Sequence, residues 1–323
     1  MSAAASGLLS AAEIGAAVLL DACLGEPSRG HPLVAFGRLA NGIERRLNPA
    51  ACGAVDPDGK GLRTRALGAC AVTLAVLPPV LILVWLDRST AAAPLLAVAT
   101  LYLVIGHRSL HEHALAVENA LRRGDLDAGR LAVARMVSRD TYDMDSARVA
   151  AATVESLLEN GNDAVFGALF WFAVAGAPGA LAFRLLNTLD AMWGYRTVRF
   201  RQFGWAAARL DDCANFLPAR LTALSYAALG RTRTALRCWR RQGATWDSPN
   251  AGPVMAAGAG ALEVRLGGGA FYHGQWRERP PLGAGAAADV GTIRRARGLL
   301  VRSVLLWSAV ATALALMAET LHA

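Results

Sequence analysis

Carboxylates, amides and arginines gather in one polar stretch between two apolar stretches of the sequence. The residues able to do chemistry there are Asn187, Asp190, Arg209, Asp211, Asp212, Asn215 and Arg220. Oxygen ligands hold hard divalent cations and guanidinium groups hold phosphates, so this mixture suits a metal and phosphate site. Salt bridging at a membrane boundary is the simpler alternative. Polar groups this close to apolar segments are costly unless they have a partner or a function.

A second acidic group repeats at every fourth position, with Glu155, Glu159 and Asp163 predicted to share one helix face. Like charges at this spacing repel each other unless a positive group lies between them, either Mg²⁺ or an arginine. Asn160 and Asn162 add oxygen atoms of the kind that Mg²⁺ accepts. A solvated acidic face is the alternative explanation.

Arg139, Asp140 and Thr141 follow an amphipathic segment and precede another helical pattern. Asp140 or Thr141 is expected to cap the next helix, which the pattern begins near Asp145. A capping role explains why an aspartate is found at position 140, but it gives no reason for the arginine at position 139.

Two turns rich in small residues occur later, one at Ser248–Gly252, which contains Asn250, and one at Leu266–Gly269. Backbone amides in such turns can bind phosphate, although glycine triplets are also common in plain loops. A Walker A motif is excluded because Lys60 is the only lysine.

The composition indicates a protein that is partly embedded in a membrane. The chain has 323 residues, of which 54% are hydrophobic and 18% are charged, and its mean hydropathy is +0.33. The net charge of +8 comes almost entirely from arginine, which either serves to bind carboxylates and phosphates or reflects arginine-rich codon usage. Nucleic-acid binding is not expected, because the basic residues alternate with acids. The five cysteines form no C-x-x-C pair, so neither a disulfide framework nor a zinc site follows.

We predict an all-α, polytopic membrane protein consisting of one domain over residues 1–323. Four apolar runs approach the roughly 20 residues that a bilayer core requires, and they lie at 7–24, 66–86, 91–105 and 299–317. The first run has no preceding Lys or Arg, so we expect it to be retained as a helix. Residues 106–298 form the polar region, and the abundance of arginine and lysine in the longer connections, Arg29 and Lys60 included, predicts that these are cytoplasmic.

Two further apolar stretches, 164–183 and 214–229, are predicted to be broken or re-entrant helices. Gly176–Gly179 interrupts the first, and Pro218 with Arg220 interrupts the second. No run reads convincingly as a strand, and residues 283–288 are expected to be a loop before the last span.

The ordered set of these motifs resembles the CobD/CbiB family of cobalamin biosynthesis over nearly the whole chain. The resemblance begins with Asp21, Gly25-Glu26-Pro27, His31-Pro32 and Gly37-Arg38, and it continues through Arg139-Asp140-Thr141, Glu155 to Asp163, and the block from Asn187 to Arg220. Ser248-Pro249-Asn250-Ala251-Gly252, Leu266-Gly267-Gly268, Tyr272 and Gly274 complete it.

This resemblance implies an adenosylcobinamide-phosphate synthase, an acid–amine ligase that uses ATP and Mg²⁺. Such an enzyme joins the carboxylate of adenosylcobyric acid to (R)-1-aminopropan-2-ol or its O-phosphate, and the sequence leaves open which of the two. It implies a multi-pass protein of the inner membrane with its active site facing the cytoplasm; association into a homo-oligomer is left open.

The same resemblance gives the candidate residues expected roles. Metal binding is expected of Glu155, Glu159, Asp163, Asp211 and Asp212. Arg139, Asp140 and Asp190 are the expected catalytic residues, with either aspartate taking the proton of the attacking amine. Phosphate or substrate binding is expected of Arg209, Arg220, Thr141, Asn187, Asn215 and Asn250.

A membrane transporter and a non-catalytic membrane scaffold are the alternatives. A transporter predicts charges spread through several spans and an internal repeat, but the polar residues gather in the connections and no repeat is found. A non-catalytic scaffold would not need a dense group of carboxylates, amides and arginines in its loops. The density of polar groups in 187–220 therefore favours an enzyme.

Overall fold

The structure is a computed structural model that describes residues 3–27, 30–52, 61–272 and 274–322. Arg29 and Lys60, used above for the orientation, lie outside the described residues. Contacts divide the chain into two compact units. The first unit comprises Met1–Ile105, Gly167–Asn215 and Ala311–Ala323, and the second comprises Gly106–Phe166 and Phe216–Val310. That the whole chain forms one domain stays a prediction.

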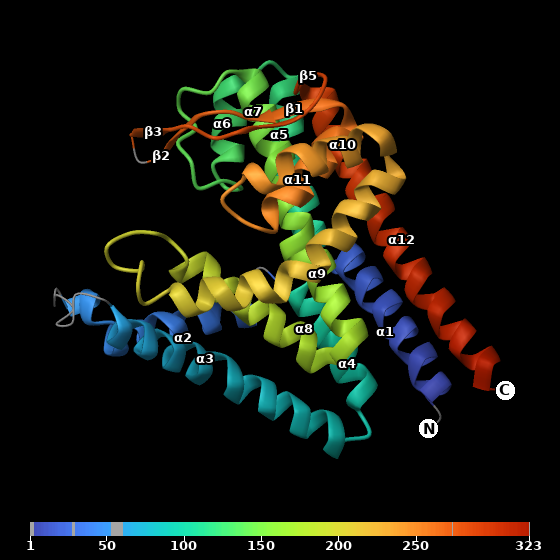
Figure 1. Cartoon of the computed structure of the whole chain (residues 1–323). Helices are drawn as coiled ribbons and strands as arrows, with labels where there is room; N and C mark the ends of the chain where they lie inside the picture. Colours follow the sequence, from blue (N-terminus) through green and yellow to red (C-terminus); the bar gives the residue numbers. More distant parts are fainter. Residues whose placement is uncertain (1–2, 28–29, 53–60, 273, 323) are drawn as a thin grey trace. The chain divides into compact units, whose positions relative to one another are not determined.

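The elements described in the first unit are all helices (Figure 1). It contains α1 (Ala3–Leu24), α2 (Pro32–Leu47), the short 3₁₀ helix η1 (Pro49–Cys52), α3 (Leu62–Ser89), α4 (Ala93–Val104) and α8 (Gly167–Trp193), with the beginning of α9 (Trp205–Leu229) and the end of α12 (Val290–His322). Near the chain ends, α1 approaches the end of α12 closely enough that a Cβ on Gly7 would lie 3.6 Å from Ala315.

Aromatic and small side chains form the core of the first unit, between α2, α3, α8 and the start of α9. Trp193 and Phe203 pack edge to face with ring centroids 5.2 Å apart, and both are fully buried. Gly68 lies against the backbone of Phe203, where a Cβ would come within 2.0 Å of the carbonyl oxygen. A glycine is therefore required on α3 at this contact.

The break predicted within 164–183 is confirmed. Ala175 and Gly176 leave helical geometry inside α8, and Gly176 has a φ of +64°, which glycine adopts without the strain of a side chain. Pro178 lies two residues after Gly176 and cannot donate a backbone hydrogen bond to the preceding turn. The two parts of α8 are thus separated where the sequence predicted.

The break predicted at Pro218 is wrong, because α9 continues from Trp205 to Leu229. A proline at this position leaves the carbonyl of Ala214, four residues earlier, without its helical donor. The indole Nε1 of Trp171 donates to that carbonyl at 2.9 Å instead. A side chain from α8 thereby replaces the missing backbone bond, and the helix is not interrupted.

The second unit consists of helices and a small sheet. Its helices are α5 (His107–Arg122), α6 (Leu126–Val133), α7 (Ser146–Gly161), the π-helical turn η2 (Asn162–Phe166), α10 (Thr232–Gln242), the 3₁₀ turn η3 (Gly243–Thr245) and α11 (Ala251–Leu262), with the end of α9 and most of α12. All residues of α11 are buried. Its alanines and glycines let neighbouring backbones approach, since a Cβ on Gly260 would lie 2.8 Å from the Thr234 carbonyl of α10.

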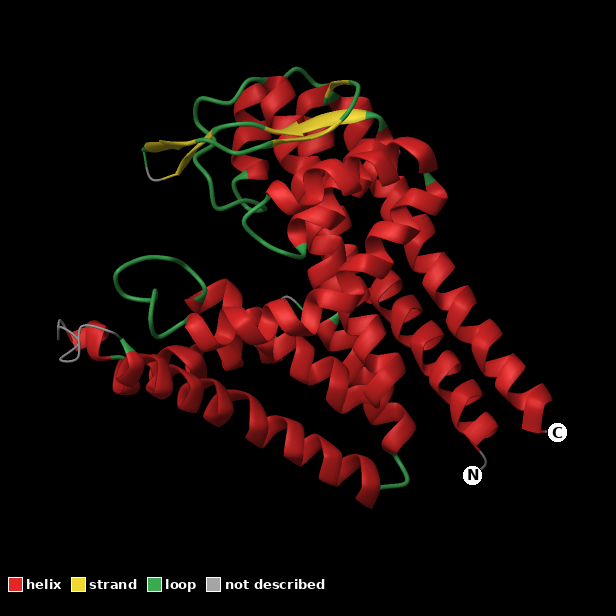
Figure 2. Cartoon of the chain, in the orientation of Figure 1, coloured by secondary structure: helices red, strands yellow, loops and turns green. Residues whose placement is uncertain are grey.

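Five short strands lie between α11 and α12, and Figure 2 draws them in yellow. They are β1 (Val264–Gly267), β2 (Ala270–Tyr272), β3 (Gln275–Arg277), β4 (Pro281–Gly283) and β5 (Ala286–Ala287). β1 pairs antiparallel with β4 and parallel with β5, and β2 and β3 form an antiparallel pair. The prediction of no strand, with a loop at 283–288, was therefore wrong, because strands this short carry no readable alternation.

The protein is a predominantly helical, polytopic membrane protein. Within the part of the chain that the structure describes, five helical segments can cross a membrane by length and composition: Gly7–Leu24, Leu62–Ser89, Ala93–Arg122, Ser146–Trp193 and Val290–Thr320. Three of them contain predicted spans, and Ala93–Arg122 overlaps the predicted span 91–105. The fifth, Ser146–Trp193, includes the stretch 164–183 that was predicted to be a broken or re-entrant helix, and the break at Gly176 lies inside it.

Candidate functional site

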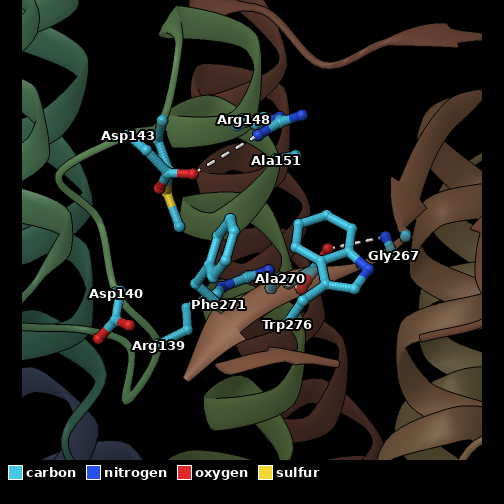
Figure 3. A pocket seen from close by; sticks show the side chains of 13 residues that line it. Arg139, Asp140, Asp143, Arg148, Ala151, Gly267, Ala270, Phe271 and Trp276 are labelled. Carbon is cyan, nitrogen blue, oxygen red and sulfur yellow. Dashed lines mark hydrogen bonds and ion pairs between the residues drawn. The ribbon is translucent and has the colours of Figure 1, made fainter. Parts of the chain in front are cut away.

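A pocket of about 340 Å³ in the second unit contains several of the predicted residues (Figure 3). Its wall is formed by the turn before α7, by α7 itself and by the strands β1 to β3: Arg139, Asp140, Asp143, Met144, Arg148, Ala151, Glu155, Gly267, Gly268, Gly269, Ala270, Phe271 and Trp276. A volume of this size is typical of a small-molecule site, for which the usual range is about 300–1,000 Å³.

The carboxylate of Glu155 connects the parts of this pocket. Its Oε2 lies 2.6 Å from Nη2 of Arg139 and 2.7 Å from Nη2 of Arg279, and its Oε1 accepts the backbone N–H of Gly267 at 2.7 Å. The residue is only 3% exposed. Three donors from three segments therefore hold one buried carboxylate, which stays compatible with burial because it is paired and hydrogen-bonded.

Local structure explains how these groups reach Glu155. Helix α7 begins at Ser146, and the side chain of Asp145 caps it by accepting the Arg148 N–H at 2.8 Å. The prediction that Asp140 or Thr141 is the cap was therefore wrong. On the opposite wall, Gly267 has a φ of +76°, and a Cβ there would lie 2.3 Å from the Pro280 carbonyl oxygen, so only glycine presents this amide without strain.

Asp140 joins the turn before α7 to the β2–β3 pair. Its Oδ2 accepts the N–H of Gly274 at 2.7 Å, and its own N–H donates to the carbonyl of Phe271 at 2.9 Å. Thr141, next in the chain, accepts the N–H of Met144 through its carbonyl at 3.3 Å. Asp140 is thus placed in the pocket wall, whereas the contact of Thr141 shapes the turn.

Aromatic rings line one side of the pocket. Phe271 and Trp276 pack edge to face with ring centroids 5.0 Å apart. Figure 3 labels both residues. Gly269 allows this arrangement, since a Cβ there would lie 2.1 Å from the Trp276 ring. Across the pocket Arg148 and Asp143 face each other at 3.9 Å. The pocket therefore presents flat apolar surface, a glycine-rich turn and charged groups together.

Glu159 lies one turn after Glu155 and lines a neighbouring hollow of about 130 Å³ with Arg139, Arg279 and Tyr272. Both arginines act electrostatically on Glu159 as well as on Glu155. The acidic repeat allowed either Mg²⁺ or arginine as the positive partner, and the structure places Arg139 and Arg279 beside these carboxylates.

Asp163 departs from the face that the repeat predicted. It lies in the π-helical turn η2, which shifts the phase of the helix. Asn162 Nδ2 donates to Asp163 Oδ1 at 2.9 Å, and Asn162 Oδ1 accepts the Thr222 hydroxyl at 3.0 Å. The asparagine is thus a link between η2 and α9.

Among the residues that the structure describes, no three His, Cys, Asp or Glu side chains are grouped so as to hold a metal ion. The bonds of Glu155 to two arginines and a backbone amide leave it poorly suited to a cation. A cage for Mg²⁺ formed by the protein alone does not fit the described residues. Magnesium bound chiefly by the phosphates of a nucleotide does not require such a cage.

Arg220 and Asn250 form a second polar contact in the second unit. Nη1 of Arg220 donates to Asn250 Oδ1 at 2.6 Å, and its Nη2 donates to the Pro249 carbonyl at 3.0 Å. The guanidinium also lies 3.6 Å from the ring centroid of Phe216. This arginine therefore fixes the turn that begins α11.

The first unit brings together a separate group of predicted residues on α8 and α9. Nδ2 of Asn187 donates to Asp211 Oδ1 at 3.3 Å, and Nδ2 of Asn215 lies 3.4 Å from both oxygens of Asp211. Burial raises the pKa of Asp211 to about 6; the two amide donors oppose that rise and the charge of Asp212 adds to it. Asp212 pairs with Arg209 at 3.4 Å.

Asp190, the other predicted proton acceptor, lies near the end of α8. Its carbonyl accepts the N–H of Gly194 at 2.7 Å, and a Cβ on Gly194 would come within 2.1 Å of Asp190 Oδ1. The aspartate thus packs against the turn that ends the helix.

Arg279 had no sequence prediction as a site residue, whereas the turn that contains Gly267 was predicted to offer backbone amides. Arg279 contacts Glu155, and its guanidinium lies 4.5 Å from the centroid of the Trp246 ring. It follows two short strands without any periodic pattern, so only the run of charges at Arg277-Glu278-Arg279 marks it.

Comparison with known proteins places the chain in a family. The sequence model described as CobD/Cbib protein matches residues 14–300. The chain belongs to the CobD/CbiB family. The resemblance seen in the motifs is therefore confirmed, and the match covers both units.

Individual relatives agree with this assignment. The chain is 56% identical over 307 residues to the cobalamin biosynthesis protein CobD of Chromobacterium violaceum, covering 95% of this chain and 97% of that protein. It is 57% identical to the CobD protein of Stutzerimonas stutzeri, covering 90% and 93%, and 40% identical to that of Mycobacterium tuberculosis, covering 86% and 87%. No solved structure gives a significant match to the chain.

Proposed function

We propose that the protein acts in cobalamin biosynthesis as the ligase that joins adenosylcobyric acid to aminopropanol or its O-phosphate, with ATP. Membership of the CobD/CbiB family and the cobalamin biosynthesis names of its relatives support the pathway. The predicted chemistry needs a site that binds phosphates and keeps water from an activated carboxyl group. The pocket around Glu155 suits that task.

The observation that carries the proposal is the pairing of Arg139 and Arg279 on one buried carboxylate beside a glycine-rich turn. Each guanidinium has five N–H donors, of which the bonds to Glu155 engage only a part. Their remaining donors and the turn at 267–269 supply groups for phosphate oxygens. The Phe271 and Trp276 rings offer an apolar surface to a flat base or ring.

The proposed reaction proceeds in two transfers. An oxygen of the corrinoid carboxylate bonds to the γ-phosphorus of ATP, the bond to the bridging oxygen breaks, and ADP leaves. The amine nitrogen then bonds to the acyl carbon, the bond to phosphate breaks, and the nitrogen loses a proton. Carboxylate is a poor acyl donor and phosphate is a good leaving group, which is why the first transfer is needed.

This chain's residues have distinct tasks in that proposal. Arg139 and Arg279 neutralise charge on the transferring phosphoryl group. Asp140, held by the Gly274 amide through one oxygen, takes the proton of the amine, and Asp190 is the alternative acceptor. Magnesium, when present, enters with ATP as its phosphate-bound cation.

Further proposed tasks follow the sequence predictions. Binding of substrate or phosphate is proposed for Asn187, Asn215 and Arg209 of the first unit, and contact with a cation is proposed for Asp211 and Asp212, as the sequence predicted. Arg220, Asn250 and Thr141 position substrate in the second unit. The protein is proposed to lie in the inner membrane with these groups on the cytoplasmic side, and reporters fused after Phe183 and Leu229 would test that orientation.

Purified protein incubated with adenosylcobyric acid, aminopropanol O-phosphate and Mg·ATP tests the reaction. We expect an amide product by mass spectrometry, with one ADP formed for each amide. Arg139→Gln should lose this activity, whereas Arg108→Gln, which alters an exposed pair with Glu112 on α5, should keep it. Absence of any amide product from the folded protein would overturn the proposal and favour a transporter or a scaffold.

A further inference from the structure

Helix α10 of the second unit presents a row of arginines to the outside. The stretch 231–242, which is α10 with its N-cap, contains five arginines and no Asp or Glu. All five are exposed: Arg231, Arg233, Arg237, Arg240 and Arg241. Positions 233, 237 and 240 recur at intervals of four and three residues, so their side chains share one face of the helix. The arginine face is defined here as Arg233, Arg237, Arg240 and Arg241.

The opposite side of α10 is fixed against α11. Ala235 and Cys238 are the buried residues of α10. A Cβ on Gly260 of α11 would lie 2.8 Å from the Cα of Ala235, so the two backbones are in close contact. Because the small side chains hold this side of the helix inward, the arginine face is turned away from the core.

The arginine face has no counter-charge of its own. Arg231, before the helix, pairs with Glu263 at 3.2 Å. Among the residues that the structure describes, neither an ion pair nor a side-chain hydrogen bond joins the four guanidinium groups of the arginine face to another residue. Like charges three or four residues apart on a helix repel each other. An external anionic surface would relieve that repulsion.

Helix α10 begins at the level where α12 becomes apolar on its outside. Nη1 of Arg302 on α12 donates to the carbonyl of Leu229, the last residue of α9, at 3.2 Å. The first residue of α10, Thr232, follows three residues later. One turn beyond Arg302, α12 exposes Leu305, and Val310 follows, within a segment that can cross a membrane. Arg302 therefore marks the level at which the lipid-facing part of α12 begins.

This level corresponds to the headgroup region of a bilayer. Basic residues are attracted to anionic lipid headgroups over about one Debye length, roughly 8–10 Å at physiological salt. Helix α10 has 11 residues and is therefore about 16 Å long. A short basic helix that starts at the edge of the hydrocarbon core is typical of a segment that contacts the membrane surface.

We propose that the arginine face of α10 binds the headgroups of anionic phospholipids in the bilayer around α12. Its charge complements their net negative charge, and the methylene stems of arginine can extend along the headgroup layer. The proposal goes beyond the ligase reaction and does not depend on it, because lipid binding requires neither ATP nor corrinoid.

Native mass spectrometry of the full chain tests this surface. The protein is released from nanodiscs that contain equal amounts of phosphatidylglycerol and phosphatidylcholine, and the bound lipids are counted. We expect the parent to retain more phosphatidylglycerol. A triple variant with Arg233→Gln, Arg237→Gln and Arg240→Gln should lower the ratio of the two lipids by at least about fivefold. Glutamine has a helix propensity close to that of arginine, and thermal unfolding checks that the variant is folded.

A second triple variant separates the arginine face from a general effect of charge. It carries Arg123→Gln, Arg135→Gln and Arg265→Gln, three exposed arginines of the same unit that lie outside α10 and do not line the pocket around Glu155. It loses the same charge as the first variant. We expect its lipid ratio to stay within about twofold of that of the parent.

Three results would overturn the proposal. The first is a folded parent that retains no excess of phosphatidylglycerol. The second is an equal lipid ratio in the parent and in the α10 variant, which is expected if the arginine face binds an acidic protein segment or a nucleic acid instead. The third is an equal fall in both triple variants. A lipid ratio that depends on the arginine face in a protein without ligase activity would support this surface while contradicting the proposed reaction.

Discussion

Arg139 and Glu155 form an ion pair of 2.6 Å in which the arginine side chain is 9% exposed and the glutamate 4%. One residue lies in the turn before α7 and the other on α7, and the pair links that turn to the sheet through Arg279 and Gly267. A pair this buried serves as an internal support for the pocket, because its removal leaves charges without compensation.

Replacing Glu155 should therefore both destabilise the protein and abolish activity. Glu155→Gln keeps the shape but leaves Arg139 and Arg279 without their counter-charge, which should lower the free energy of unfolding by about 3 kcal/mol or more. Thermal unfolding in detergent measures the loss. Arg108→Gln breaks an exposed pair and should change stability by less than about 1 kcal/mol. Equal effects of the two changes would contradict the role given to Glu155.

The glycine turn supplies a second test with a control one residue away. In Gly267→Ala the Cβ would lie 2.3 Å from the Pro280 carbonyl oxygen at a φ of +76°. Gly268 has a φ of +80° but open space around its Cβ position, so Gly268→Ala should cost only about 1–2 kcal/mol of backbone strain. We expect Gly267→Ala to be clearly less stable and less active. A milder effect at 267 than at 268 would be inconsistent with this packing.

Asp211 makes stability depend on pH in the first unit. Its pKa in the folded protein is about 6, above the ordinary 3.8, so the folded state holds the proton more tightly. Stability therefore falls as pH rises from near 4 through 6, by up to about 3 kcal/mol. Asp211→Asn should remove that fall, so the variant should be more stable than the parent near pH 8, and the difference should shrink near pH 5.

Asp289 provides the control of opposite sign for that experiment. Hydrogen bonds from the Thr292 hydroxyl and N–H lower the pKa of its carboxyl group. It therefore contributes stability above its ordinary pKa that is lost as pH falls. Asp289→Asn should lower the unfolding temperature near pH 7, and unfolding curves that move the same way for both variants would refute the assignment for Asp211.

Arg220 should be replaceable by lysine only at a cost. A lysine carries a point charge and does not reproduce the two planar donors that reach Asn250 Oδ1 and the Pro249 carbonyl. We expect Arg220→Lys to lose about 1–2 kcal/mol of stability. Arg231→Lys, in an exposed pair with Glu263, should change stability by less than about 0.5 kcal/mol. Unfolding temperatures that do not separate the two would argue against the contact.

Sequence reasoning succeeded where a local pattern carried the signal. The Gly176 and Pro178 pair marked the break in α8. The four-residue spacing of Glu155 and Glu159 indicated a positive partner, either Mg²⁺ or arginine, and the structure brings two arginines to these carboxylates. Both inferences depend on residues near each other in the chain, so helical periodicity alone was sufficient.

Sequence reasoning was wrong or incomplete where a side chain far away in the sequence determines the local structure. Pro218 reads as a helix break until Trp171, from another helix, bonds the exposed carbonyl of Ala214. Arg279 has no periodic context, and it reaches Glu155 only because the short strands turn back toward α7. Neither contact is encoded by spacing, since each arises from tertiary packing.

Transfer of an oxygen isotope tests the central claim most directly. Adenosylcobyric acid labelled with ¹⁸O in both oxygens of the reacting carboxylate is incubated with the purified protein, aminopropanol O-phosphate and Mg·ATP. Activation by γ-phosphoryl transfer predicts one labelled oxygen in the released phosphate and the other in the amide carbonyl. Unlabelled phosphate, label in AMP, or no amide at all would contradict the account.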